Sequence, residues 1–142
     1  MGRRLAFFLL GLFLAFLAHA EMRWTETDGQ GDTQVHLYFF WSQSCPHCLE
    51  AHPFIEAIPK ERPWVVLHAL EVSRSQENAQ RFEDMAQAIG QEVEGVPTFF
   101  YCGGMQVGWG GAELSGEQLL NGQLLNGLDT CRRSGGTLRS SD

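Results

Sequence analysis

The stretch VHLYFFWSQSCPHC, residues 35–48, decides how this chain folds. Its first half, residues 35–41, is an apolar run interrupted only by His36, which is typical of a strand buried on both faces of a sheet. Its second half ends in the Cys-x-x-Cys motif Cys45-Pro46-His47-Cys48. Where such a motif opens a helix, one helical turn brings the two sulfur atoms within bonding distance, and the helix N-terminus stabilises the first thiolate. The pattern indicates a dithiol–disulfide pair at a strand-to-helix junction.

Residues 1–20 have the features of a secretory signal peptide. Arg3 and Arg4 form a basic region, residues 5–17 are apolar, and Ala18-His19-Ala20 is a cleavage signal, so Glu21 is expected to start the mature chain. The apolar run is short for a membrane span, which takes about 20 residues. An uncleaved N-terminal anchor is the alternative. We expect an exported protein, periplasmic in a Gram-negative organism and otherwise secreted or anchored by the uncleaved signal.

Length and charge limit the classes of function. Removing 20 of the 142 residues leaves 122, enough for one domain with one core. The full chain has a formal charge of −7, and loss of Arg3 and Arg4 makes it −9, which argues against nucleic acid as a partner. In an oxidising compartment the four cysteines can form structural or catalytic disulfides. The single Cys-x-x-Cys has no second copy at zinc-ribbon spacing, so no metal site is expected.

Apolar periodicity and turn residues place the remaining elements. We expect a flexible lead-in over residues 21–34, a helix from the motif to about residue 58, a strand over 64–72, a helix ending at Gly90, strands over 98–102 and 105–109 around Gly103-Gly104, and a helix over 116–131. The domain spans 35–131, and the polar segment 132–142 is expected to be a disordered tail. This order predicts an α/β fold, β-α-β-α-β-β-α, with a central mixed four-stranded sheet and helices on both faces.

This order, with Cys-x-x-Cys at the first helix and Val96-Pro97 before the third strand, resembles the thioredoxin superfamily over most of residues 35–128. Phe40-Trp41 before the motif and Pro53 after it are further similarities, and the dipeptide Pro46-His47 resembles that of DsbA-type disulfide oxidases. The resemblance implies a thioredoxin-like fold and thiol–disulfide exchange without a bound cofactor. It also implies that the dipeptide between the cysteines tunes the redox potential.

The chain departs from these relatives in three ways. Residues 49–96 are too few to hold the helical insertion of DsbA. The lead-in is too short for the first strand–helix unit of thioredoxin, so the core is closer to that of glutaredoxin. Phe39 stands where the family has a buried acidic residue that handles the proton of the second cysteine. The resemblance therefore does not extend to the proton-handling residue.

Each residue of the motif has an expected role. Cys45, at the exposed helix start, is expected to be the nucleophile, and Cys48, one turn later, the buried resolving thiol. His47 is expected to stabilise the Cys45 thiolate, which would make the disulfide more oxidising. The alternative is an exposed imidazole with little coupling to the sulfur. Pro46 suits the first helical position, where its missing N–H is not needed.

Substrate binding is assigned by the resemblance. It implies a cis Pro97 that turns the backbone of Val96 toward the sulfur atoms, where it would pair with an extended substrate segment. Trp41 is expected to pack beneath the active-site loop.

The second cysteine pair, Cys102 and Cys131, closes the third strand and ends the last helix. Because the C-terminal helix packs over the sheet in this fold, we expect a structural Cys102–Cys131 disulfide. Gly122 and Gly127 each cost that helix about 1 kcal/mol relative to alanine, and the disulfide would hold the weakened helix in place. The alternative is a second redox pair that relays electrons to or from Cys45–Cys48.

The leading hypothesis is a monomeric, exported thiol–disulfide oxidoreductase that exchanges disulfides with cysteine-containing exported proteins through Cys45 and Cys48, leaning toward oxidation. One alternative is a periplasmic reductase fed by a membrane redox partner. Another is a copper metallochaperone that uses the same cysteines with His47 or His52, since soft thiolates suit Cu(I). A third is an interaction protein whose disulfide only switches its shape.

Overall fold

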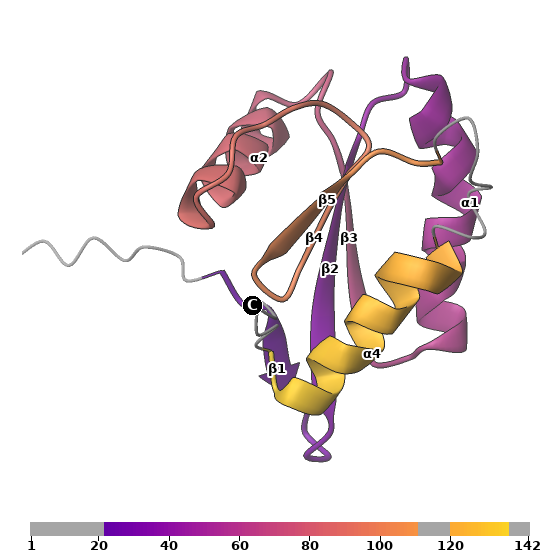
Figure 1. Cartoon of the computed structure of the whole chain (residues 1–142), viewed down its shortest axis with the longest axis vertical. Coiled ribbons are helices and arrows are strands. Elements are labelled where there is room, and N and C mark those ends of the chain that lie inside the picture. Colours follow the sequence, from indigo (N-terminus) through magenta and orange to yellow (C-terminus); the bar gives the residue numbers. More distant parts are fainter. Residues whose placement is uncertain (1–21, 111–119, 137–142) are drawn as a thin grey trace, which may run out of the picture.

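A mixed five-stranded sheet with helices on both faces forms the molecule (Figure 1). The computed structural model describes residues 22–110 and 120–136. Its elements are β1 (Thr25–Thr27), β2 (Thr33–Trp41), α1 (Pro46–Glu61), β3 (Val65–Glu71), α2 (Gln76–Ala88), β4 (Thr98–Tyr101), β5 (Gly104–Val107), a π-helical turn η1 (Leu120–Leu124) and α4 (Leu125–Ser134).

Strand β2 is the centre of the sheet. Along one edge it pairs in parallel with β3, from Val35 opposite Val65 to Trp41 opposite Glu71. Its other edge is shared, because β1 pairs antiparallel with the start of β2 and β4 pairs antiparallel with residues 38–40. Strand β5 then pairs antiparallel with β4. The parallel β2–α1–β3 unit places the carboxyl end of β2, and with it the start of α1, at one end of the sheet.

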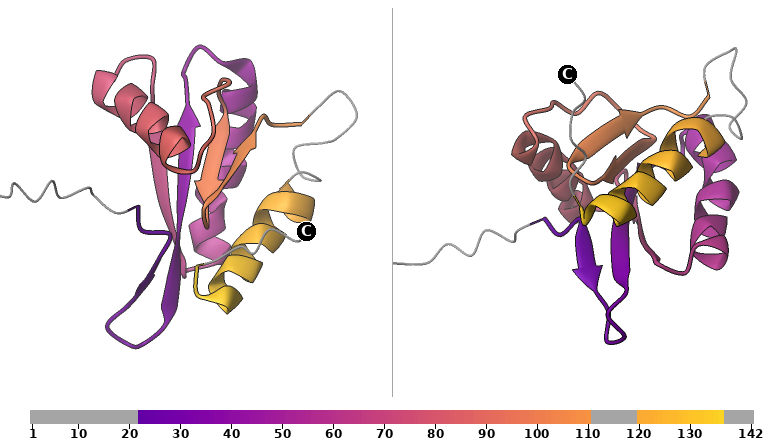
Figure 2. Two further views of the ribbon diagram at one scale, coloured as in Figure 1. Left: turned by 60° about the vertical axis from the view of Figure 1, so that its left-hand side comes forward. Right: turned by 60° about the horizontal axis from the view of Figure 1, so that its bottom comes forward.

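Alternating side chains of β2 divide the core into two layers. Val35, Leu37 and Phe39 face α1 and α4, whereas Tyr38 and Phe40 face α2. Figure 2 shows α1 and α4 on one side of the sheet and α2 on the other. All five side chains are almost fully buried, which explains why this strand is a continuous apolar run. The predicted α/β fold with helices on both faces is confirmed.

The N-terminal lead-in differs from the prediction. Residues 25–27 form β1, so the sheet has five strands instead of four and the lead-in over 21–34 is not uniformly irregular. The turn into β2 is closed by Asp28, whose carboxylate accepts hydrogen bonds from the backbone N–H groups of Gln30 and Asp32, both at 2.9 Å. A three-residue polar strand has no apolar alternation, so only pairing with β2 reveals it.

The C-terminal boundary and one turn also shift. Helix α4 runs to Ser134, three residues past the expected domain end at Cys131. The β4–β5 turn is made by Cys102 (φ 50°) and Gly103 (φ 77°), one residue before the expected Gly103-Gly104. Two successive positive φ angles are the geometry of the tight hairpin turn that matches strand twist. The expected signal peptide over 1–20, and residues 137–142 of the expected tail, lie outside the described residues.

The two glycines near the C-terminal helix are expected to respond in opposite ways to alanine. A Cβ at Gly127 would lie 2.5 Å from Cε2 and 2.7 Å from the hydroxyl oxygen of Tyr101, whose ring is buried between α4 and the sheet. A Cβ at Gly122 would meet nothing within 4 Å. We expect Gly127→Ala to lower the free energy of unfolding by about 1–3 kcal/mol through overpacking. Gly122→Ala should raise it by up to about 1 kcal/mol.

Urea denaturation of both variants measures these changes. Equal changes in the free energy of unfolding for the two variants would show that the Tyr101 ring does not limit the space at Gly127.

A pair of histidines joins β2 and β3 on the α2 face. His36 Nδ1 and His68 Nε2 are 2.8 Å apart, and His36 Nε2 lies 3.5 Å from a carboxylate oxygen of Glu26 on β1. Burial lowers the pKa of His68 below the ordinary value of 6.5, and the neighbouring His36 and Arg81 lower it further. The folded protein therefore holds His68 neutral in conditions where the unfolded chain takes up a proton.

As a result, the free energy of unfolding is expected to decrease as the pH is lowered. The contribution of neutral His68 is complete above its ordinary pKa of 6.5 and is lost as pH falls through the lower pKa of the folded state. We expect the unfolding midpoint to decrease from pH 7.5 to pH 5.5, and to decrease less in His68→Gln. Thermal denaturation across that range tests this. An identical pH dependence in the variant would exclude His68 as the source.

Candidate active site

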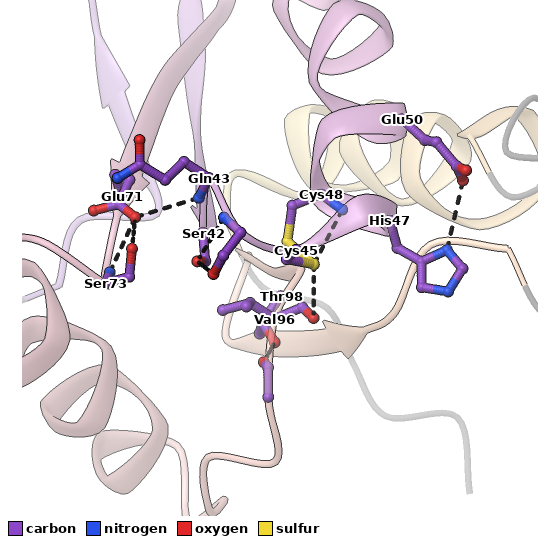
Figure 3. The surroundings of a disulfide bond; sticks show 12 residues. Ser42, Gln43, Cys45, His47, Cys48, Glu50, Glu71, Ser73, Val96 and Thr98 are labelled. Carbon is purple, nitrogen blue, oxygen red and sulfur yellow. Dashed lines mark hydrogen bonds and ion pairs between the residues drawn. A yellow bond between two sulfur atoms is a disulfide. The ribbon is translucent and has the colours of Figure 1, made fainter.

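The Cys-x-x-Cys motif lies where β2 ends and α1 begins (Figure 3). Cys45 is the N-cap of α1, and Pro46 occupies the first turn, as predicted from its missing N–H. The loop before the helix is held locally: the backbone N–H of Cys45 donates to the Ser42 carbonyl at 3.1 Å, and the Ser42 and Ser44 hydroxyl oxygens are 2.9 Å apart. The junction thus presents Cys45 at a helix start.

Cys45 and Cys48 form a disulfide with their Cα atoms 5.2 Å apart. Cys45 is half-buried, whereas Cys48 is fully buried. The backbone N–H of Cys48 points at Cys45 Sγ from 3.2 Å. After reduction, this N–H group and the helix dipole would both stabilise a thiolate on Cys45. The accessible and the inaccessible sulfur therefore stand where the sequence places the nucleophile and the resolving thiol.

The segment before β4 approaches the same sulfur. The Val96–Pro97 peptide bond is cis, and the carbonyl oxygen of Val96 lies 3.6 Å from Cys45 Sγ. Pro97 is buried, and the hydroxyl of Thr98 donates to the Gly95 carbonyl at 2.5 Å, which closes the turn beneath it. A chain segment 51 residues away thus contributes backbone to the surroundings of Cys45.

His47 lies beside the disulfide but does not face it. Its Nδ1 is 3.5 Å from a carboxylate oxygen of Glu50, and both side chains are about two-thirds exposed. Figure 3 shows the ring directed away from the two sulfur atoms. In this disulfide state the structure does not bring the imidazole and Cys45 together, although the sequence suggested that pairing.

Trp41 and His52 pack together behind the motif. Their ring centroids are 4.4 Å apart in an edge-on arrangement, and His52 also meets the edge of Phe39 at 5.6 Å. Trp41 thus packs against α1 one turn after Cys48. The sequence singled out His52 only as a ligand in the copper alternative, and nothing in its neighbours along the chain indicated this packing.

Glu71 is a site residue that the sequence reasoning missed. Its carboxylate accepts a hydrogen bond from the backbone N–H of Gln43 at 3.4 Å (Figure 3). It also accepts one from the backbone N–H of Arg74 at 2.8 Å. The hydroxyl of Ser73 also donates to it, and this bond is the main reason why the pKa of Glu71 lies below its ordinary value. Glu71 thereby ties the loop before Cys45 to the loop after β3. Its position opposite Trp41 in the β2–β3 register is visible only once the sheet is assembled.

The second cysteine pair lies at the other end of the sheet. Cys102 and Cys131 form a disulfide with Cα atoms 5.9 Å apart, and both side chains are buried. The bond joins the β4–β5 turn to α4. Strand β4 begins near Cys45 and ends at the turn, so its length, about 10 Å, separates the two disulfides. In this conformation the two disulfides are not in contact, so they cannot exchange directly with each other.

Residues 22–110 and 120–136 contain neither a metal-binding cluster nor a membrane-spanning helix. No group of three or more histidine, cysteine, aspartate or glutamate side chains is arranged to hold a metal ion. Within the same described part of the chain, every helix is too short or too polar to cross a membrane.

Known structures are similar to this chain at the level of the fold. No family model and no curated protein matches it. A structural genomics target from Agrobacterium tumefaciens is 20% identical with a TM-score of 0.54, over 72% of this chain and 47% of that one. The chain therefore spans about half the length of that protein. Buckwheat glutaredoxin in complex with glutathione is 20% identical over 72% of this chain and 81% of its own, with a TM-score of 0.41.

The topology defines the class. A parallel β2–α1–β3 unit, an antiparallel β4–β5 hairpin and a closing α4, with Cys-x-x-Cys at the start of α1, constitute a thioredoxin-like fold.

Proposed function

We propose that this protein is a thiol–disulfide oxidoreductase that exchanges disulfides with cysteines of other proteins through Cys45 and Cys48. The observation that carries the proposal is the asymmetry of the pair. Cys45 is accessible at a helix N-cap with a backbone N–H on its sulfur, whereas its partner Cys48 is fully buried. Exchange requires one sulfur that a substrate can reach and one that only its neighbour can reach.

The proposed exchange uses only the sulfur atoms of the protein and its substrates and needs no bound cofactor. A substrate thiolate attacks Cys45 Sγ, forming a mixed disulfide and breaking the Cys45–Cys48 bond, and Cys48 leaves as a thiolate that takes up a proton. A second substrate thiolate then attacks the substrate sulfur of the mixed disulfide and releases the Cys45 thiolate. The substrate is oxidised to a disulfide and the protein pair is reduced. A further disulfide, supplied by a redox partner, reoxidises the pair. Every step is reversible, so the same residues serve a reductase.

We favour the oxidising direction. The Cys48 N–H and the α1 dipole stabilise the Cys45 thiolate, and stabilising the reduced form makes a disulfide more oxidising. The resemblance of Pro46-His47 to the DsbA-type dipeptide supports this direction too. The orientation of His47 toward Glu50 does not contribute to it. We further propose export of the protein, with cysteine-containing exported proteins as substrates and a membrane protein as redox partner.

The reduction potential of the Cys45–Cys48 pair tests the direction. Equilibration with glutathione buffers, followed by acid quenching and alkylation, gives the fraction reduced at each ratio. A potential above about −150 mV would place the protein with disulfide donors. A value near or below about −250 mV would assign it to the reductases. Failure to catalyse the reduction of insulin by dithiothreitol would contradict the proposed activity in both directions.

A further inference from the structure

Resolution of a mixed disulfide at this site is accelerated by a proton acceptor next to Cys48. Cys48 must lose its proton before it can attack a mixed disulfide on Cys45, because only the thiolate is nucleophilic. Its side chain is fully buried, and an apolar environment disfavours the thiolate. Strand β2 faces α1 with Phe39, which stacks on Phe99 and offers no titratable group. The acceptor must come from elsewhere.

His52 lies on the same face of α1 as Cys48, one turn further along. Residues four apart on a helix have Cβ atoms about 5–6 Å apart, so the imidazole and the thiol are neighbours on one face of α1. The ring is about one-fifth exposed and packs against Trp41 and Phe39 of β2. Its Nε2 is buried and has no hydrogen-bond partner among the described residues. A buried polar atom without a partner is costly and calls for an explanation such as a catalytic role.

The other ring nitrogen of His52 is held by a carboxylate. Nδ1 lies 3.3 Å from Oε1 of Glu56, which is four residues further along α1 and more than half exposed. A carboxylate at Nδ1 favours the tautomer that carries its proton there, which leaves the lone pair on the buried Nε2. Cys48, His52 and Glu56 therefore form one row along α1, from a buried thiol to a solvent-exposed carboxylate.

We propose that His52 is the proton acceptor for Cys48 and that Glu56 positions its ring. This inference rests on the proposed function. During resolution of a mixed disulfide, the Cys48 proton moves to His52 Nε2, the Cys48–Cys45 bond forms, and the bond from Cys45 to the substrate sulfur breaks. The substrate leaves as a thiolate and the imidazolium later releases its proton to water beside Glu56. In the oxidising direction the proton returns from His52 to the departing Cys48 thiolate.

Glu56 on α1 is the charged group paired with His52, and Cys48 lies one turn away on the same helix. The rings of Phe39 and Trp41, which β2 packs against His52, do not titrate. A pH dependence of the resolving step that disappears with His52 can therefore be assigned to this row.

A two-phase reaction with dithiobis-nitrobenzoate tests the proposal. Protein with an open Cys45–Cys48 pair releases the first nitrothiobenzoate when Cys45 attacks the reagent, and the second when Cys48 resolves the mixed disulfide. We expect His52→Gln to slow the second phase by about tenfold to a hundredfold at pH 7 and to change its pH profile. The first phase should stay within about twofold, because Cys45 keeps its N-cap contacts.

Glu56→Gln provides a second test in case His52→Gln impairs folding. Glu56 is exposed, so the fold is retained, and we expect a smaller loss in the second phase, roughly threefold to tenfold, as the ring loses its positioning partner. Glu61→Gln is the matched control, since Glu61 is an exposed glutamate of α1 whose carboxylate lies near Arg62. It should leave both phases unchanged.

The outcomes separate the two proposals. A second phase in His52→Gln with the wild-type rate and pH profile would overturn the role of His52 and leave the proposed function standing. Absence of the first phase in the wild-type protein would instead overturn the proposed function.

Discussion

Replacement of Cys45 by serine is expected to abolish disulfide exchange, whereas replacement of Cys48 is expected to trap it halfway. Cys45 is the accessible sulfur, so its loss removes the only atom of the pair that a substrate can attack. The turnover of insulin reduction should fall by roughly a thousandfold or more, as for loss of an enzyme nucleophile. Cys48→Ser retains the nucleophile and its surroundings but has no thiol to resolve the mixed disulfide.

Mass spectrometry after incubation with glutathione disulfide distinguishes the two variants. Cys48→Ser should carry one stable glutathione adduct on Cys45, and Cys45→Ser should carry none because Cys48 is fully buried. The expected asymmetry is the direct consequence of the exposures of the two sulfur atoms. An adduct on Cys48 in the Cys45→Ser variant, or equal turnover in both variants, would show that the second sulfur is also open to substrate.

Removal of the Cys102–Cys131 disulfide by the double change Cys102→Ser/Cys131→Ser is expected to lower stability strongly and leave exchange intact. The cysteines are 29 residues apart, and closing a loop of this size contributes about 3 kcal/mol by restricting the unfolded chain. In a domain of this size that corresponds to a decrease of roughly 10 °C in the melting temperature. The two buried serine hydroxyls add to the loss.

Thermal denaturation and insulin turnover, measured on the same preparation, separate the structural from the redox interpretation of this disulfide. Lost stability with retained turnover at 20 °C supports a structural role. Retained stability with lost turnover would support electron relay, and would require a conformational change, because β4 separates the two disulfides.

Much of the fold could be predicted because its signals are local. The apolar run at residues 35–41 became the central strand, and the helix expected to end at Gly90 became α2, whose N-cap Ser75 accepts a hydrogen bond from the N–H of Asn78. The positions of Cys45 and Cys48 relative to each other also follow from local geometry, since one helical turn separates them. Such features depend on residues within a few positions of one another, so a sequence pattern is enough to find them.

The candidate site was only partly predictable for the same reason. Glu71 reaches the loop before Cys45 from the end of another strand, and Val96 reaches Cys45 from a segment 51 residues away. The placement of Val96 was anticipated only through resemblance to a family. His47 and His52 are similar in the sequence, both on α1 near the cysteines. His47 lies on the exposed face of α1 beside Glu50, whereas His52 lies on the face that packs against β2 and is only partly exposed.

The sequence by itself determined the order of strands and helices from β2 to β5, the burial of β2 on both faces, and a cysteine pair at a helix start. Only the tertiary structure decided that Thr25–Thr27 is a strand, that Tyr101 leaves no room for a side chain at Gly127, and that His52 has a buried nitrogen without a partner. The physical reason is the range of the interactions. Helix caps, apolar alternation and one-turn spacings act between neighbours in the chain, whereas sheet edges, close contacts between elements and burial depend on residues that meet only after folding.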